Sequence, residues 1–111
     1  MEKVSTTGRV FKCATGEQVT LSFVAHNVDM RITYRFDDEA EPKIVQGDSL
    51  TFPVTKELTI LRVFFHFINE GGTGGSYDIT LAGSLGGNFP DKPPVKQSGV
   101  LVPVRRYAFA V

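Results

Sequence analysis

The longest apolar run of the chain extends from Leu58 to Asn69, with the sequence LTILRVFFHFIN. It contains no Gly or Pro and is rich in β-branched and aromatic residues, which favours a strand over a helix. Side chains of a strand alternate between two faces. One face of this strand is wholly apolar and is predicted to lie in the core: Leu61, Val63, Phe65 and Phe67.

Seven further segments have strand-like patterns, and clusters of Gly, Pro, Asn and Asp separate several of them. None of the segments shows a helical period, a repeat or a heptad. Together with the central stretch they predict an all-β fold, an antiparallel β-sandwich of jelly-roll-like or immunoglobulin-like type with about seven to eight strands. The segments are Arg9–Cys13, Glu17–Asn27, Met30–Phe36, Lys43–Gln46, Ser49–Val54, Ser76–Ala82 and Val100–Val111.

The connections predict which strands pair. Only Val28 and Asp29 separate Glu17–Asn27 from Met30–Phe36, so these two strands are expected to form an antiparallel hairpin. Ser76–Ala82 is expected to return antiparallel to the central stretch. Pro53 cannot donate to a ladder of hydrogen bonds, which predicts an edge position for its strand. Gly83–Gly99 is rich in Gly and Pro and is expected to be a long irregular loop.

Length and charge limit the classes of function. A chain of 111 residues fits one domain, residues 1–111. The scaling of surface with mass gives about 6,000 Å² folded against about 18,000 Å² unfolded, enough burial for one core without disulfides or metal. Positive and negative side chains balance at 12 each. No global field therefore attracts nucleic acid or an anionic membrane, and neither is expected as a partner.

The single cysteine, Cys13, cannot form an internal disulfide and is expected to be a small buried strand residue rather than a reactive thiol. The first residues, MEKVSTTG, lack the apolar core of a signal peptide, and no run approaches the length of a membrane span. These features leave the compartment open, with the cytoplasm as the simplest expectation.

Two segments resemble a known family. RVFKCATGEQVTLSF is similar to the opening of bacterial pre-peptidase C-terminal domains, and LTILRVFFHFINEGGTGGSYDITLAG resembles their closing hairpin through Gly75, Ser76, Tyr77, Ile79 and Leu81. The resemblance covers roughly the first 83 residues and implies a jelly-roll-like sandwich of the kind found beside secreted enzymes. Some members of that family bind calcium or polymeric substrates. This chain departs from them in lacking a secretion signal and in its extra C-terminal segment.

An acidic loop is the best candidate for a metal site. Asp37, Asp38, Glu39 and Glu41 lie close together in sequence, and clustered carboxylates on a loop can supply the oxygen ligands that calcium prefers. Their spacing does not match an EF-hand, so solvated turn residues are the alternative. Calcium is the only cofactor that the sequence suggests, and no other is expected.

The only imidazoles, His26 and His66, lie on the less apolar faces of predicted strands. Paired across a sheet, they would form a site with Arg62 or Asp78. Zinc needs at least three protein ligands and no third is evident, so surface histidines are the alternative. The candidate ligand-binding residues are therefore His66, Arg62, Phe64 and His26.

The second face of the central strand carries both apolar and basic residues and is predicted to be only partly covered. Ile60, Phe64 and Ile68, if exposed together, would form a larger apolar patch than a monomer usually carries. The loop Gly83–Gly99, a second subunit or a ligand could cover it, and a homodimer is preferred. The residues of this face are Ile60, Arg62, Phe64, His66 and Ile68.

Three functions remain in view. The first is a non-catalytic module that binds a carbohydrate polymer or a protein surface through the loops Asp37–Pro42 and Gly83–Gly99. The second is a small structural or homo-oligomeric protein without a ligand. The third is an enzyme whose site forms around His26, His66 and Asp78. No nucleophile elbow or phosphate-binding loop supports the third.

Overall fold

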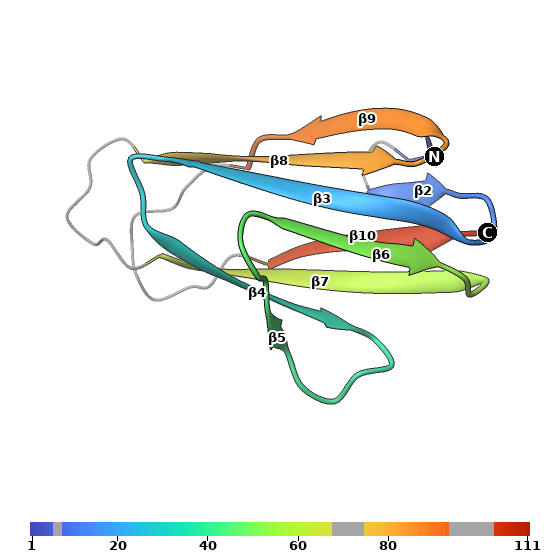
Figure 1. Ribbon diagram of the computed structural model, residues 1–111, viewed down its shortest axis with the longest axis horizontal. Helices are drawn as coiled ribbons and strands as arrows, with labels where there is room; N and C mark the ends of the chain where they lie inside the picture. The colour runs from blue at the N-terminus through green and yellow to red at the C-terminus, as the bar shows by residue number, and fades with distance from the viewer. Residues whose placement is uncertain (6–7, 68–74, 94–103) are drawn as a thin grey trace.

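The computed structural model describes residues 1–5, 8–67, 75–93 and 104–111, with only the backbone described at Phe67. All regular structure in these residues is strand, arranged in two packed sheets (Figure 1). The all-β prediction and the two-layer arrangement are therefore confirmed. No helix in the described ranges is long and apolar enough to cross a membrane. The side chain of Phe67 and the whole of Ile68 lie outside the described residues, and so do the predictions made for them.

The first layer is a six-stranded sheet with β7 near its middle. β7 is hydrogen-bonded to β10 on one side and to β4 on the other, both antiparallel. The pairing of β10 with β2 is parallel, so the expectation of a purely antiparallel sandwich was wrong at this position. In spatial order the strands are β1 (Glu2–Lys3), β2 (Val10–Lys12), β10 (Val104–Ala110), β7 (Leu58–Phe67), β4 (Met30–Phe36) and β5 (Lys43–Ile44).

The second layer is a four-stranded antiparallel sheet. β3 lies in its interior and pairs with β6 and β8 along most of its length. Pro53 lies in β6, which is an edge strand as predicted, and Pro90 lies in β9 at the opposite edge. Proline at both edges discourages pairing with another chain. The spatial order is β6 (Ser49–Val54), β3 (Glu17–His26), β8 (Ser76–Gly83) and β9 (Gly86–Asp91).

The described residues form ten strands rather than seven to eight. The two additions are β1, in the first residues of the chain, where the sequence predicted no strand, and β9, inside the segment Gly83–Gly99 that was expected to be irregular. β9 pairs with β8 over Ile79–Gly83 despite its Gly-Gly start, because the tight turn at Ser84 and Leu85 places it directly beside β8. Residues 94–99 of the expected loop are not among those described.

Two predicted strand pairings, that of β3 with β4 and that of β7 with β8, were wrong. β3 and β4 lie in different sheets, and so do β7 and β8. The chain crosses between layers after β3, with Asn27 in the left-handed region at φ 55°. An arch between sheets and a hairpin within one sheet both direct alternate side chains into the same core. The alternating pattern is therefore the same in the two cases.

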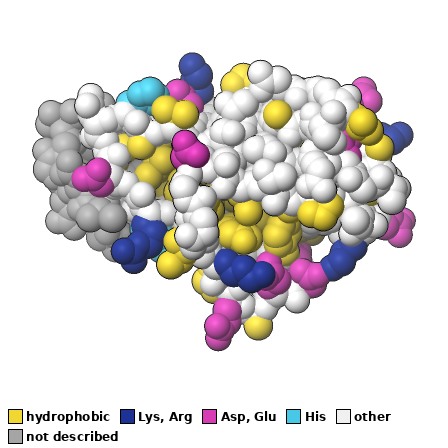
Figure 2. All heavy atoms as spheres, in the orientation of Figure 1, with side chains coloured by type: hydrophobic (Ala, Val, Ile, Leu, Met, Phe, Trp, Pro, Cys, Tyr) yellow, Lys and Arg dark blue, Asp and Glu magenta, His cyan; other side chains and the backbone are white. Residues whose placement is uncertain are grey.

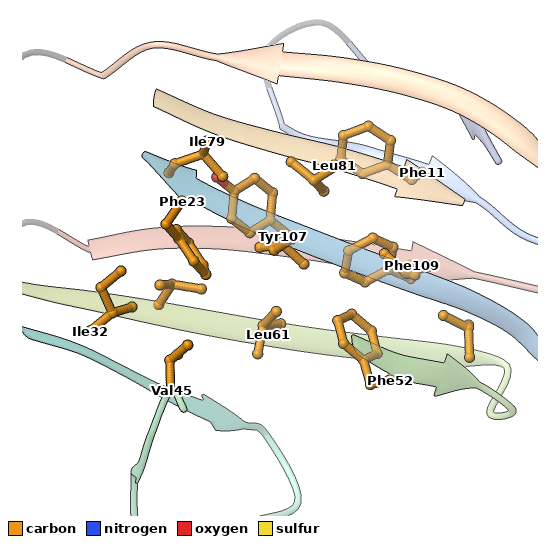
Figure 3. Packing of buried hydrophobic residues seen from close by; sticks show 14 of the residues in the cluster. Phe11, Phe23, Ile32, Val45, Phe52, Leu61, Ile79, Leu81, Tyr107 and Phe109 are labelled. Atoms are coloured by element: carbon orange, nitrogen blue, oxygen red, sulfur yellow. The ribbon is translucent and has the colours of Figure 1, made fainter. Parts of the chain in front are cut away.

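The predicted core face of β7 is confirmed. Leu61, Val63 and Phe65 are completely buried, with exposed fractions of 0%. The ring of Phe65 contacts two aromatic rings of the opposite sheet, those of Tyr77 at 4.7 Å and Phe23 at 6.0 Å between ring centroids. Figure 3 shows labelled side chains of both sheets, such as Leu61 of β7 and Phe23 of β3, lying between the two layers.

Two residues with ionisable side chains, Cys13 and Glu17, are buried. Cys13 is buried as expected, and burial raises the pKa of its thiol, so it is protonated at neutral pH. Glu17 in β3 is also buried, with an exposed fraction of only 3%.

Candidate functional site

A cleft of about 440 Å³ opens where the two sheets separate, between edge strand β6 and the segment joining β4 to β5. β4 ends at Phe36, which leaves the first residues of β7 uncovered on that side. Figure 2 shows this hollow below the middle of the view, with hydrophobic atoms inside it and charged side chains along its lower rim. The cleft is lined by Phe36, Asp37, Asp38, Glu39, Lys43, Phe52, Pro53, Thr55, Lys56, Leu58, Thr59 and Ile60.

Two phenylalanines form the floor of the cleft. Phe36 and Phe52 meet edge to face with ring centroids 5.1 Å apart, and Phe52 packs in turn on Phe109 at 5.3 Å. Phe52 belongs to the buried core, whereas Phe36 is only partly buried. The floor is therefore an outward extension of the core, and its shape is fixed by core packing.

Three ion pairs form the rim. Lys43 Nζ lies 2.6 Å from Glu39 Oε2, Lys56 pairs with Asp38, and Arg62 pairs with Asp37. The hydrogen bond from Lys56 lowers the pKa of Asp38, and that from Lys43 lowers the pKa of Glu39. Glu39 in turn raises the pKa of Lys43. These groups are consequently charged at neutral pH.

Hydrogen bonds hold the acidic turn that carries the rim. The amide of Glu39 donates to the carbonyl of Phe36 at 3.0 Å, and the Glu39 carboxylate accepts from the Phe36 amide at 3.2 Å. Arg35 Nη1 donates to the Glu39 carbonyl at 3.0 Å, and the Asp37 amide donates to the Ile60 carbonyl at 3.1 Å. The turn is thus fixed to both β4 and β7.

The four carboxylates expected to bind calcium do not converge. Asp37, Asp38 and Glu39 each contact a different cation, and Glu41 is exposed. Within the described ranges no group of three or more His, Cys, Asp or Glu side chains is placed to hold a metal ion. Calcium binding stays a prediction from the sequence that this geometry does not strengthen.

The structure separates the two histidines. His66, Phe64 and Arg62 share the outer face of the six-stranded sheet, whereas His26 lies on the outer face of the other sheet, on the opposite side of the sandwich. His26 Nε2 lies 3.2 Å from Asp78 Oδ2, and His66 Nε2 lies 3.3 Å from Thr33 Oγ1. No site containing both imidazoles is formed.

Sheet register brings together three arginines that are far apart in the sequence. Arg62 on β7 is the direct cross-strand partner of Arg35 on β4 and of Arg106 on β10. We call these three residues the arginine row. Arg106 is exposed and has no ion pair within the described parts of the chain. Sequence reasoning missed the row, because adjacency across strands depends on register, which the local pattern does not reveal.

The neighbouring Arg105 faces inward, as expected of adjacent residues on a strand. Asp91 on β9 accepts hydrogen bonds from Arg105 at 3.1 Å, from Arg9 at 3.2 Å and from the Tyr107 hydroxyl at 3.0 Å. Burial raises the pKa of Tyr107, so its hydroxyl stays protonated and donates. The network links β9 to the six-stranded sheet and so stabilises the fold.

The fold and the cleft define a β-sandwich with a preformed groove at one edge of its two layers. Comparison of the chain with protein-family models found no family that matches, and comparisons with curated proteins and with solved structures found no match either. The resemblance to pre-peptidase C-terminal domains therefore stays a prediction from the sequence.

Proposed function

We propose that the chain is a non-catalytic binding module whose cleft takes a segment of a carbohydrate polymer. The observation that carries this proposal is the preformed cleft, with an aromatic floor and a rim of fixed charged groups. Binding sites for small ligands are typically concave and apolar, with a few placed polar groups that give orientation. This combination suits a sugar, whose C–H face packs on an aromatic ring while its hydroxyls bond to the rim.

The ionisation of the rim supports binding rather than hydrolysis. A glycosidase needs one carboxyl group kept protonated as a general acid, with a raised pKa. In this cleft the pKa values of Asp38 and Glu39 are lowered by Lys56 and Lys43. These carboxylates are suited to accept hydrogen bonds from sugar hydroxyls and not to protonate a leaving group.

The proposal includes a jelly-roll-like class for the sandwich. Its support is the order of the strands: among the ten described strands, the chain changes sheet at most connections and stays within one sheet only at β1–β2, β4–β5 and β8–β9. Repeated crossing between layers is typical of jelly rolls. A single domain is part of the same proposal.

A glycan array tests the proposed function, followed by calorimetric titration of the best oligosaccharide into two variants. Leu58 lines the cleft and is 54% exposed, so Leu58→Ala removes a ligand contact without opening the core. We expect affinity to fall about tenfold, because about 1.4 kcal/mol of apolar contact is lost. Leu85→Ala is the matched control, since Leu85 is 70% exposed and does not line the cleft.

The outcome separates this function from its alternatives. Equal loss of affinity in both variants would place the ligand elsewhere on the molecule. Absence of binding to any glycan, together with self-association, would favour the second candidate, a small structural or homo-oligomeric protein. An enzyme built around both histidines is the weakest candidate, because they lie on opposite faces of the sandwich.

A further inference from the structure

Arginines are concentrated on the outer face of the six-stranded sheet. Arg31 lies on the same face of β4 as Arg35, and it is the cross-strand partner of His66. With the arginine row this places four of the chain's six arginines on one face, in a protein with a net charge of zero. Like charges directly opposite each other across strands are destabilising, so such a row lowers the stability of the fold.

Little in the described structure compensates for this repulsion. Arg62 pairs with Asp37 at the rim of the cleft, and Arg35 donates to the backbone carbonyl of Glu39. Arg31 and Arg106 are exposed and form no ion pair within the described ranges. The guanidinium groups of Arg31 and Arg106 are therefore accessible to a ligand from solvent. Guanidinium groups bind carboxylate, sulfate and phosphate groups in bidentate fashion more readily than ammonium groups do.

We propose that the arginine row binds the acidic groups of a polysaccharide, either sulfates or carboxylates. Neighbouring strands lie about 4.8 Å apart, so the row extends about 10 Å across the sheet, comparable with one or two sugar rings. The inference rests on the proposed function for the identification of the ligand as a carbohydrate. It adds that this carbohydrate is acidic and that it continues from the cleft onto the sheet.

The surroundings of the row support a sugar chain as the occupant. Phe64 lies two residues from Arg62 on the same face of β7, between its cross-strand partners Thr33 and Val104. Its partly exposed ring adjoins Val104, which is 48% exposed, so the anion site borders an apolar surface. On the other side of Arg62, Ile60 lines the cleft. The two sites are therefore continuous along β7.

A nucleic acid fits these observations less well. Proteins that bind single strands combine a basic track with several aromatic rings on which successive bases stack. Among the described positions of β4, β7 and β10 on this face, Phe64 is the only Phe, Tyr or Trp, and His66 is the only other aromatic ring.

Calorimetric titration of the whole chain tests the inference with four probes: a short heparin fragment, an oligogalacturonate, a neutral oligosaccharide and poly(U). We expect one of the acidic oligosaccharides to bind more tightly than the neutral one, with an affinity that falls as salt is raised. Arg106→Gln should weaken that binding about tenfold, because it removes a charge-assisted contact. Within the described residues the Arg106 side chain forms no hydrogen bond or ion pair, so the variant should fold normally.

Lys92→Gln is the matched control, since it removes one exposed positive charge beyond β9, which belongs to the other sheet. Equal losses in the two variants, equal affinity for neutral and acidic probes, or tighter binding of poly(U) would each overturn the inference.

The cleft variant Leu58→Ala keeps the two proposals separate. If Leu58→Ala weakens binding and Arg106→Gln does not, the cleft proposal stands and the anion site is rejected. If Arg106→Gln weakens the binding of an acidic oligosaccharide and Leu58→Ala does not, the anion site is supported and the cleft is rejected as a binding site.

Discussion

Glu17 shows how one buried carboxylate is accommodated. Its Oε1 accepts a hydrogen bond from the Ala14 amide at 3.1 Å, and its Oε2 lies 2.9 Å from the Met1 amino group. Burial alone would raise the pKa of Glu17, but the bonds from Met1 and Ala14 outweigh this effect and lower it. The folded state therefore favours the ionised carboxylate over the neutral acid.

The lowered pKa predicts the direction of a pH effect. A carboxyl group with a depressed pKa in the folded state stabilises the fold above its ordinary pKa, which is 4.5 for Glu17. That stabilisation is lost as the pH falls through the lowered value. We expect the melting temperature of the Glu17→Gln variant to decrease less on acidification below 4.5 than that of the wild type. Thermal melts across this range measure the difference.

Glu57→Gln is the control for this experiment. Glu57 is exposed, and its side chain makes no hydrogen bond or ion pair in the described structure. Its substitution should leave the pH dependence of the melting temperature unchanged. If Glu17→Gln melts with the same pH dependence as the wild type, the carboxylate is not held in its ionised form by the fold.

At the scale of the element, β7 predicts a contrast between neighbouring positions. Phe65 is fully buried against two aromatic rings of the other sheet, whereas Phe64 lies on the outer face. Phe65→Ala should lower the free energy of unfolding by about 3–5 kcal/mol, through lost burial and a residual cavity. Phe64→Ala should cost clearly less. Chemical denaturation measures both, and equal costs would contradict the assignment of the two faces.

The strands were predictable because their signal is local. β4 and β6 have the bounds expected from alternation and turn residues, and the core face of β7 was identified from its apolar positions. Which sheet a strand joins was not predictable, because an arch and a hairpin give the same alternation. β9 was missed because Gly86, Gly87 and Pro90 resemble loop residues, although its pairing with β8 is made by backbone groups.

The candidate site was predictable only in part, for a similar reason. The sequence identified the acidic turn as chemically distinctive, but the cations that pair with it come from distant segments, such as Lys56 and Arg62. In the structure each of the three carboxylates Asp37, Asp38 and Glu39 pairs with a cation. Arg62 was also selected as a ligand-binding candidate. Its partners Arg35 and Arg106 could be recognised only once the register of three strands was known.

For the whole molecule, a net charge of zero conceals a local concentration of arginine on one face. Three acidic residues of the turn lie at the rim of the cleft, and the arginine row lies beside them on the sheet. Expectations drawn from net charge alone describe the long-range field and not the local surface. The proposed acidic glycan depends on this local surface, within a distance comparable with the Debye length of about 8 Å at physiological salt.

The arrangement of this surface bears on the homodimer that the sequence favoured. Ile44 and Val104, which are 55% and 48% exposed, are apolar residues that a second copy could bury. They lie on the same face as the arginine row, however. A two-fold interface centred on this face would bring the two rows against each other, at a cost that rises as water is excluded.

We therefore expect a monomer at low ionic strength, with the face open to its ligand. Light scattering coupled to size exclusion should give a mass of 12.2 kDa at all accessible concentrations. Added salt screens repulsion between the rows, so a dimer that forms only at high salt would show that charge keeps the copies apart. A dimer that persists at low salt and is dissociated by Val104→Asp would contradict this expectation. The face would then be an interface between copies, and acidic glycans would have to compete with the second subunit for it.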